Sequence, residues 1–231
     1  MAMKGSQPAG PLDVGTIGRM VRDGAAGEAM LIKLLASNPD DKNAVIVALG
    51  EACGNAGIPI LHAIAADRGA TIDERCSALV ALAKRQGSDA SETLARALLD
   101  EDRVIRRYGL LCMAYVGDGR SWDAVLYALR VSLAGPAPRF PFALNPAALF
   151  SQSEVLPPIA YLARFATNAS REEMVVGLVS SNWDKLYNAE QEWLRSHWLA
   201  CDPNAEKPMP PNLSRIQSWI QRPFFAPLYV D

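Results

Sequence analysis

The side chains best suited to metal binding or nucleophilic chemistry are few and widely separated in this chain. Neither of its two histidines, His62 and His197, has a second histidine and a glutamate at HExxH spacing, so no zinc ligand set begins there. The four cysteines form no CxxC pair, and three of them fall at apolar positions of expected helices, where a thiol packs as a small hydrophobic group. We therefore expect no metal and no cofactor. The cysteines are Cys53, Cys76, Cys112 and Cys201.

Motifs for serine hydrolysis and for nucleotide chemistry are missing as well. The sequence contains no GxSxG, which would mark a nucleophilic serine on a strained turn, and no GxxxxGK[ST], which would cradle phosphates. These absences favour a binding protein over an enzyme.

The densest basic cluster is formed by Arg103, Arg106 and Arg107, and it is the best candidate for a contact surface. Guanidinium groups can engage the carboxylates of an acidic partner, although exposed charges on a helix more often only interact with water. The chain as a whole carries a net charge of -2 at a pI near 5.8, which gives no global attraction to phosphate backbones or anionic lipid. We expect a protein partner, and neither nucleic acid nor a membrane.

Targeting segments are not recognisable in the sequence. The opening stretch "MAMKGSQPAGPLDVG" lacks the apolar core of about 7 to 15 residues of a signal peptide, and no later run reaches the roughly 18 apolar residues of a membrane span. Half of the residues are hydrophobic, which is enough for a continuous core. These features predict a folded cytoplasmic protein.

The elements that must position the basic cluster belong to a repeat. One pattern occurs over residues 26–55, 56–88 and 89–119: a short apolar helix, a polar turn, a longer apolar helix and a Gly-polar ending. The fragments "ALGEACGN" and "ALAKRQGS" match position for position, and "CMAYVGD" is the same ending one residue shorter. Self-similarity at this period predicts a stacked helical array. We expect Gly54, Gly87 and Gly117 to end helices in the left-handed conformation.

The stretch "DEDRVIRRYGLLCMAYVGDG", residues 100–119, indicates why stacking is needed. Ile105, Tyr108, Cys112 and Tyr115 recur at helical spacing on one side, while other apolar residues cover a second side. A helix that is apolar on more than one side must pack against more than one neighbour. Gly109 in its middle is expected to allow close approach of an adjacent helix.

The segment "LLDEDRVIRRYGLLCMAYVGD" resembles the short HEAT-like repeat of the type also found in phycobilin lyases. Asp100 and Arg106 occupy the acidic and arginine positions of that pattern, which in the family form a structural ladder. Arg75 and Lys42 fall in register with Arg106, but Gly69 and Ala36 stand where Asp100 does, so the ladder is incomplete here. The resemblance covers roughly residues 26–130. It implies an all-α fold: a right-handed α-solenoid of helical hairpins with an irregular helical C-terminal half.

The expected organisation is a single domain in four parts. A flexible N-terminus covers residues 1–11 and the HEAT-like array residues 12–134. A proline-rich loop follows at 135–152, where four prolines prevent a helix, and additional helices with an aromatic tail fill 153–231. Ser170 and Glu173 predict a capping box in that last part.

The resemblance implies a non-enzymatic protein-binding scaffold, because the family serves mostly in binding. An immunity protein that occludes the active site of a toxin is one form of this function. The second helix of each repeat usually lines the concave side in the family. The contacts nominated on this basis are Arg75, Lys84, Arg103, Arg107 and Tyr115.

The alternative is an enzyme, either a HEAT-like DNA glycosylase or a bilin lyase. A glycosylase requires a basic stripe to neutralise phosphates, and acidic residues interrupt such a stripe here. Trp122 with Asp123, and Trp183 with Asp184, could hold a flipped nucleotide. The plainer interpretation is that Ser121 and Asn182 cap helices and that the two aspartates complement the helix dipole.

The aromatic tail also has two interpretations. Its apolar side chains could fold back over the last helices, since a terminal unit of an array has one face without a neighbour. They could instead form a partner-binding strip, because aromatic residues supply large contact areas. The residues concerned are Phe224, Phe225, Leu228 and Tyr229.

Overall fold

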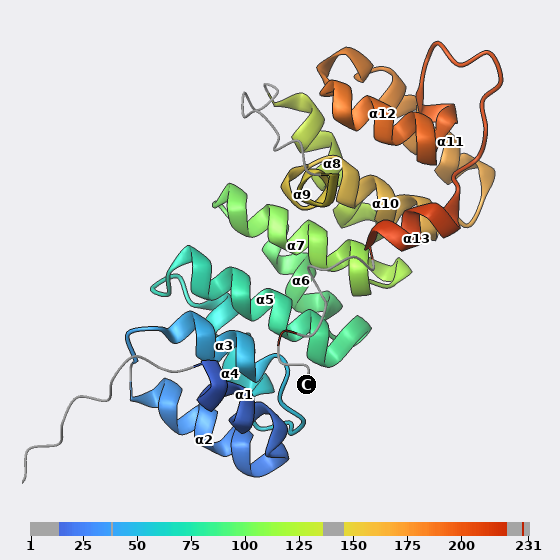
Figure 1. Ribbon diagram of the computed structural model, residues 1–231. Helices are drawn as coiled ribbons and strands as arrows, with labels where there is room; N and C mark the ends of the chain where they lie inside the picture. Colours follow the sequence, from blue (N-terminus) through green and yellow to red (C-terminus); the bar gives the residue numbers. More distant parts are fainter. Residues whose placement is uncertain (1–13, 38, 136–145, 221–227, 229–231) are drawn as a thin grey trace, which may run out of the picture. The chain divides into compact units, whose positions relative to one another are not determined.

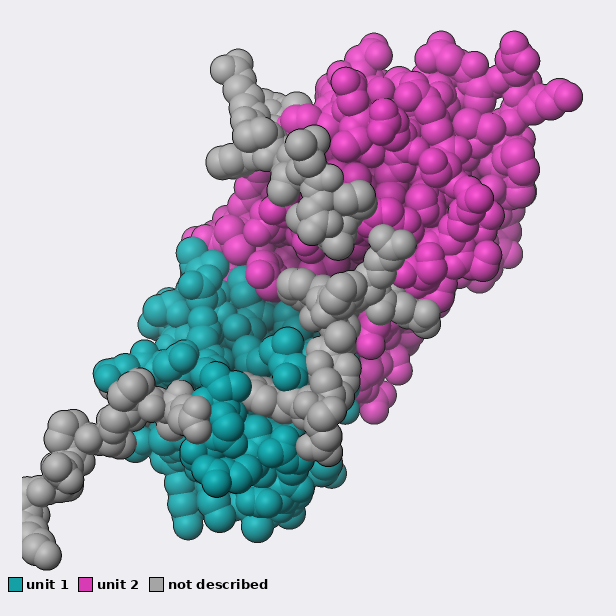
Figure 2. Space-filling view, in the orientation of Figure 1, with its two compact units in different colours: residues 1–85, 227–231 teal, residues 86–226 magenta. Residues whose placement is uncertain are grey.

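The computed structural model describes residues 14–37, 39–135, 146–220 and 228. All regular structure in these ranges is helical, and none of the described residues forms a strand, so the prediction of an all-α fold is confirmed (Figure 1). The chain divides into two compact units, which Figure 2 colours separately. Unit 1 comprises residues 1–85 and 227–231, and unit 2 comprises residues 86–226.

Unit 1 contains a lead-in helix and the first two sequence repeats. The lead-in helix is α1 (Val14–Arg22), and each repeat forms a pair of helices. The first pair is α2 (Gly24–Ala36) and α3 (Lys42–Leu49), and the second is α4 (Ile58–Ala66) and α5 (Ile72–Gln86). In the first pair the leading helix is the longer one, which is the reverse of the predicted order.

Local capping explains where the second helix of each pair in unit 1 begins. The Asp41 carboxylate accepts a hydrogen bond from the Ala44 amide at 3.1 Å at the start of α3. At α5 the Thr71 hydroxyl accepts from the Glu74 amide and the Glu74 carboxylate accepts from the Thr71 amide, which is a reciprocal capping box. These short-range bonds satisfy backbone donors that a helix start otherwise leaves unpaired.

The second helices of the two pairs, α3 and α5, are in contact. A Cβ at Gly50 would lie 2.7 Å from the Cβ of Ala81, so the two backbones approach closely. Beside them, Lys84 Nζ lies 2.7 Å from Glu51 Oε1 in a partly buried ion pair. Equivalent helices of the first two repeats are therefore neighbours within unit 1.

A buried carboxylate on α2, that of Glu28, joins three parts of unit 1. Its oxygens accept from the Ala56 amide at 3.2 Å and from the Gly57 amide at 3.0 Å, in the turn before α4. Glu28 Oε1 also lies 3.3 Å from Nη2 of Arg85, whose Nη1 donates to the Leu49 carbonyl at 2.6 Å. The buried pair thus ties α2 to the end of α3, to the following turn and to the end of α5.

Unit 2 contains the third repeat and the helices that follow it. The repeat forms α6 (Ser91–Ala97) and α7 (Arg103–Val116), and α8 (Trp122–Ala134) comes next. Beyond the undescribed residues 136–145 the helices are α9 (Pro146–Gln152), α10 (Leu156–Phe165), α11 (Ala169–Ser180), α12 (Asn188–His197) and α13 (Leu213–Ile220). Short 3-10 turns lie at Gly87–Ala90, Gly119–Ser121, Trp183–Lys185 and Leu199–Cys201.

The central helix of unit 2 is α10, which packs against both α7 and α8 (Figure 1). Arg164 donates from Nη1 to the carbonyl of Ala114 in α7. The Tyr161 hydroxyl donates to the carbonyl of Asp118, and burial raises the pKa of Tyr161 to about 12, which keeps the phenol protonated. Because α10 bridges α7 and α8, it fixes the angle between them.

Two of the three glycines expected in the left-handed conformation serve a different purpose. Gly87 does have a positive φ of 55°, as predicted. The prediction is wrong for Gly117, whose φ is -57°, and for Gly54, which is not among the glycines with positive φ. A Cβ at Gly117 would lie 2.8 Å from the Tyr161 ring, and one at Gly54 would lie 1.9 Å from Glu28 Oε2. Both glycines provide space for a neighbouring side chain.

Gly109 confirms the expectation of close helix approach. A Cβ at this position would lie 3.1 Å from the Cβ of Ala97 and 3.2 Å from Cδ2 of Leu98. Helix α6 therefore packs directly onto the middle of α7.

Several boundaries differ from those expected. The division between the two compact units falls between residues 85 and 86, inside the segment predicted as the array. The predicted loop at 135–152 ends in α9, because proline at the first position of a helix needs no amide partner. The cap of α11 is Asn168, which accepts from the Arg171 amide at 2.9 Å, so the predicted box at Ser170 is wrong.

Two predictions concern residues at the chain ends. The expected flexible segment 1–11 and the tail residues Phe224, Phe225 and Tyr229 lie outside the described residues. Leu228 is described and exposed, and its amide donates to both carboxylate oxygens of Glu51 at 2.9 Å. Among the described helices, none combines the length and apolarity required to cross a membrane.

Candidate partner-binding groove in unit 2

A groove of about 550 Å³ runs between α7 and α8 in unit 2 and contains the predicted basic cluster. The α7 side presents Arg103, Arg106, Arg107 and Leu110, which share one face at i, i+3, i+4 and i+7 spacing. We call this site the arginine groove. Its full lining is Leu98, Leu99, Asp100, Arg103, Arg106, Arg107, Leu110, Tyr127, Ala128, Val131, Ser132, Gly135 and Glu154.

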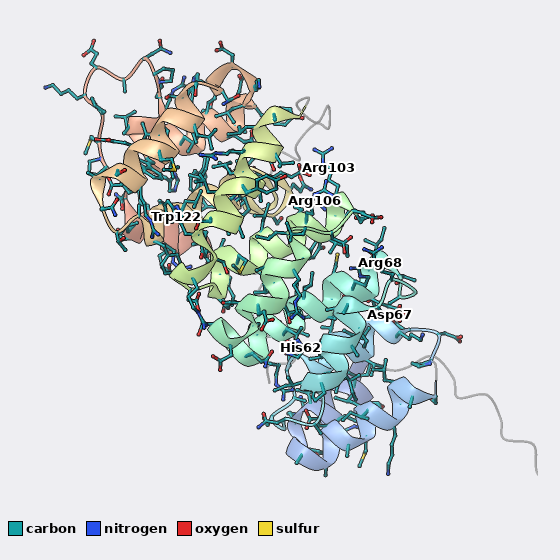
Figure 3. The ribbon with its side chains drawn as sticks, turned by 180° about the vertical axis from the view of Figure 1, so that it is seen from behind. His62, Asp67, Arg68, Arg103, Arg106 and Trp122 are labelled. Carbon is teal, nitrogen blue, oxygen red and sulfur yellow. The ribbon has the colours of Figure 1, made fainter. Side chains whose placement is uncertain are left out.

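The three arginines of the groove are held in different ways, and Figure 3 labels two of them, Arg103 and Arg106. Arg103 forms an ion pair from Nε to Glu154 Oε1. Arg106 donates from Nη1 to the carbonyls of Asp100 and Glu101, each at 2.8 Å, and so fixes the turn between α6 and α7. The Arg107 guanidinium carbon lies 5.9 Å from the Tyr108 ring centroid. Its Nε is buried and has no hydrogen-bond partner among the described residues.

The ladder expected from the resemblance takes a different form here. The described bonds of Arg106 go to backbone carbonyls, including that of Asp100. Oδ1 of Asp100 accepts from the Asp102 amide at 2.9 Å, and Asp102 in turn caps α7 by accepting from Val104 at 2.7 Å. The acidic residues therefore shape the start of α7, where the arginines are displayed.

The acidic side of the groove is positioned by a buried hydrogen-bond network behind it. The Ser153 hydroxyl accepts from the amides of Val155 at 3.0 Å and Leu156 at 2.9 Å, and it donates to Glu190 Oε1 at 2.6 Å. Glu190 also accepts from the Tyr187 amide at 3.1 Å. Burial raises the pKa of Glu190, whereas these hydrogen bonds oppose that rise. The network fixes the backbone on either side of Glu154.

The α8 side of the groove is largely apolar and open. Tyr127 and Val131 are exposed there, and Leu99, after α6, is 70% exposed. Lys185 donates to the Leu133 carbonyl at 3.0 Å and so anchors the end of α8. The groove therefore combines guanidinium groups on one wall with accessible aliphatic and aromatic surface on the other.

The structure brings together two of the five predicted contact residues. Arg103 and Arg107 both line the groove, whereas Tyr115 lies further along α7 and is half-buried. Arg75 and Lys84 belong to unit 1. Arg75 donates from Nε to the Ala65 carbonyl at 3.2 Å, and Lys84 forms the partly buried pair with Glu51.

Sequence reasoning missed the apolar wall of the groove and one of its two acidic residues, Glu154. Tyr127 and Val131 are spaced like core residues of α8, and only their exposure identifies them as a surface. Glu154 follows the proline-rich segment, and nothing in the sequence joins it to Arg103. A search for apolar residues left exposed on a helix could have found the first two, but it requires a structure.

The two Trp-Asp pairs have their tryptophan rings in the interior of unit 2. Trp122 and Trp183 are both buried. Arg171 lies over the Trp122 ring at 4.6 Å and Arg195 over the Trp183 ring at 5.3 Å. Ser121 and Asn182 occupy the predicted N-cap positions, of α8 and of the 3-10 turn Trp183–Lys185, but neither side chain makes a cap hydrogen bond. Asp123 and Asp184 lie in the first turns, as predicted.

The part of the chain that the structure describes contains no cluster of metal-ligating side chains. No group of three or more His, Cys, Asp or Glu side chains there could hold a metal ion. Cys76, Cys112 and Cys201 are buried and Cys53 is exposed. The expectation of buried thiols on helices is confirmed for Cys76 in α5 and Cys112 in α7. Cys53 lies beyond the end of α3 and is exposed, and Cys201 is buried in a 3-10 turn.

Comparisons of this chain with protein-family models, with curated proteins and with solved structures find no match.

Proposed function

We propose that the protein is a non-enzymatic binding scaffold whose arginine groove holds an acidic and apolar segment of a partner protein. The observation that carries this proposal is the pairing of walls in one groove of about 550 Å³. Three guanidinium groups stand against two carboxylates, and one of these carboxylates, Glu154, is already engaged by Arg103. Arginine and exposed aromatic side chains are the types that most often dominate protein contact surfaces.

The placement of the arginines supports a role in binding. Cations near a helix N-terminus oppose the helix dipole and cost about 0.3–1 kcal/mol each. Within α7 the first turn contains no acidic residue, and the carboxylate at its N-cap is that of Asp102. Arg103, Arg106 and Arg107 lie in the first five positions of the helix. A partner carboxylate in the groove would be attracted by the guanidinium groups and by the dipole together, which offsets the cost to the isolated helix.

The right-handed HEAT-like solenoid is the architecture that we propose for the scaffold. Its support is the sequence repeat, the formation of one helix pair from each repeat, and the contact of α3 with α5 in unit 1. Repeat scaffolds of this kind serve mainly in binding. The more specific expectation of an immunity protein stays a prediction, to be tested by co-expression with toxins of neighbouring genes.

The proposed function can be tested with a phage-displayed library of random peptides selected against the full-length protein. We expect the selected peptides to share aspartate or glutamate next to leucine, phenylalanine or tyrosine. Their affinity for an Arg107→Gln variant should fall by about 1.5–3 kcal/mol, the value of a hydrogen bond to a charged group. Tyr127→Ala should weaken binding separately, through the loss of apolar contact.

The matched control is Arg120→Gln, which removes an exposed arginine of the same unit that pairs with Asp118 outside the groove. Affinity for this variant should equal that of the wild type. Selected peptides without acidic residues, or equal binding to the Arg107 and Arg120 variants, would contradict the proposal.

A further inference from the structure

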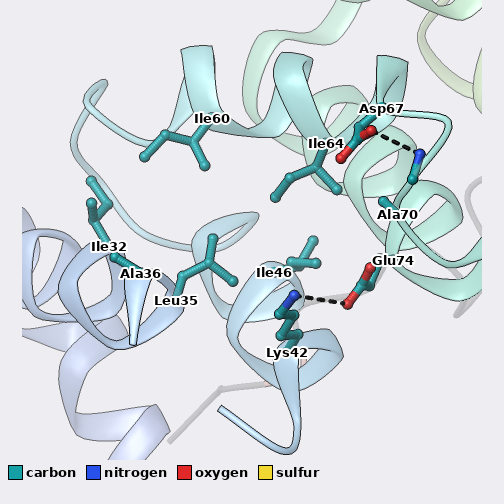
Figure 4. A pocket seen from close by; sticks show the side chains of 11 residues that line it. Ile32, Leu35, Ala36, Lys42, Ile46, Ile60, Ile64, Asp67, Ala70 and Glu74 are labelled. Carbon is teal, nitrogen blue, oxygen red and sulfur yellow. Dashed lines mark hydrogen bonds and ion pairs between the residues drawn. The ribbon is translucent and has the colours of Figure 1, made fainter. Parts of the chain in front are cut away.

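Unit 1 contains a second, chemically different cavity of about 350 Å³ (Figure 4). Its walls are aliphatic: Ile60 and Ile64 project from α4 toward Leu35 of α2 and Ile46 of α3. No aromatic residue occurs anywhere in residues 1–85. We call this cavity the aliphatic cleft, and its size lies within the range of small-molecule sites.

Helix α4 indicates that the aliphatic cleft accepts a ligand. Every residue of "IPILHAIAA" except His62 is apolar, and a helix that is apolar on all sides is normally covered on all sides. Only Leu61 and Ala65 of α4 are fully buried. Ile60 and Ile64 remain half-buried at the cleft, as do Ile32 and Leu35 opposite them. Aliphatic surface on both walls is thus still accessible to water.

The polar groups at one end of the aliphatic cleft carry an excess of negative charge. Lys42 Nζ lies 3.7 Å from Glu74 Oε1, so these two charges balance each other. Asp67 is the additional carboxylate. Its Oδ1 accepts from the Gly69 amide at 2.8 Å, while Oδ2 has no hydrogen-bond partner among the described residues. Asp67 is exposed, so its carboxylate can accept a hydrogen bond from a cationic ligand.

From these observations we infer that the aliphatic cleft binds a linear aliphatic ammonium compound. The chain lies between α2 and α4, and the ammonium group donates to Asp67. A fatty carboxylate fits less well, because its head group would meet the net negative end. This inference does not depend on the function proposed for the arginine groove, which lies in unit 2.

Straight-chain n-alkylammonium ions from butyl to octyl are suitable probes for the full-length protein. Each methylene that leaves water should strengthen binding about fourfold, which corresponds to about 0.8 kcal/mol. Binding can be followed by NMR of protein labelled at the isoleucine δ1 methyl groups. The signals of Ile60 and Ile64 should shift on titration, while those of Ile105 and Ile159, in the core of unit 2, should not.

The head group is tested with octylammonium, 1-octanol and octanoate, which share one chain. We expect octylammonium to bind most tightly and octanoate least. Asp67→Asn should weaken octylammonium about two- to fivefold, as expected for a solvent-exposed ion pair, and leave 1-octanol unchanged. Asp40→Asn, an exposed aspartate of unit 1 that does not line the cleft, is the control and should change neither affinity.

Three outcomes would overturn the inference. The first is a set of shifts that include Ile105 and Ile159 as strongly as the cleft isoleucines, because it would indicate general detergent action. The second is octanoate binding as tightly as octylammonium. The third is an equal loss of octylammonium affinity in the Asp67 and Asp40 variants. Failure of any of these tests leaves the arginine groove unaffected, since its peptide assay uses different variants and a different ligand.

Discussion

Replacement of Glu28 by glutamine is expected to destabilise unit 1 strongly, because its carboxylate is the acceptor for three donors. Glu28 is 2% exposed and Arg85 is 8% exposed. Glutamine retains the shape, but its NH2 group would face one of the backbone amides of Ala56 and Gly57 or the guanidinium of Arg85. A buried charge is then left without its counter-charge.

The size of the effect follows from these contacts. Breaking a buried ion pair by removing one partner costs about 3–5 kcal/mol. Arg85 keeps its bond to the Leu49 carbonyl, and the amide oxygen of glutamine can still accept one hydrogen bond, so we expect about 3 kcal/mol. A domain has only about 5–15 kcal/mol of stability in total, so unit 1 should lose much of its resistance to urea.

The assay uses the uneven distribution of chromophores. All five tryptophans lie in unit 2, so tryptophan fluorescence reports the unfolding of unit 2, whereas far-ultraviolet circular dichroism follows the helices of both units. Glu28→Gln should lower the urea midpoint seen by circular dichroism. Comparison with the fluorescence midpoint shows how far the loss extends to unit 2.

The matched control makes the same chemical change at an exposed ion pair. Glu92 is 79% exposed and pairs with Arg96 one helical turn later, so Glu92→Gln should cost at most about 0.5 kcal/mol. If the two variants unfold at the same urea concentration, the argument that Glu28 organises unit 1 is refuted.

Three further predictions concern a glycine, a carboxyl group and the thiols. Gly54→Ala places a Cβ 1.9 Å from Glu28 Oε2 and should lower the free energy of urea unfolding by about 1–3 kcal/mol. The control is Gly177→Ala, which has nothing within 4 Å and should be neutral or stabilise α11 by up to about 1 kcal/mol. Equal effects of the two substitutions would contradict the steric argument. The raised pKa of Glu190 means that the folded state holds this proton more tightly than the unfolded chain, so the stability it contributes is present at low pH and is lost as the pH rises above 4.5. Followed by tryptophan fluorescence, wild type should therefore lose stability relative to Glu190→Gln from about pH 4 to pH 7, and a relative gain would show the opposite shift. Brief iodoacetamide treatment of the native protein, followed by mass spectrometry, should modify Cys53 alone, because Cys76, Cys112 and Cys201 are buried. Burial also raises the pKa of the Cys201 thiol to about 12, which keeps it unreactive. Early labelling of Cys201 would disprove this prediction.

The helices themselves could be predicted from the sequence. The three repeats form helix pairs at α2–α3, α4–α5 and α6–α7, because apolar periodicity and polar turns act over a few residues. Local signals were less reliable at the helix ends. A Ser-x-x-Glu pattern pointed to Ser170, but Asn168, two residues earlier, makes the cap of α11. Competing cap residues differ by only a few tenths of a kcal/mol, so the packing of the chain decides between them.

Clustering of Arg103, Arg106 and Arg107 follows from sequence alone, since helical geometry places residues at this spacing on one face. Only the tertiary structure decided what lies opposite them: Tyr127 and Val131 from α8, and Glu154 after α9. In the same way, the sequence could mark Gly54 and Gly117 as special, but the reason is a neighbouring side chain, Glu28 or Tyr161, that is distant in the chain. Periodicity records which face of a helix is apolar. The identity of the residue that meets this face depends on long-range packing, which no local pattern encodes.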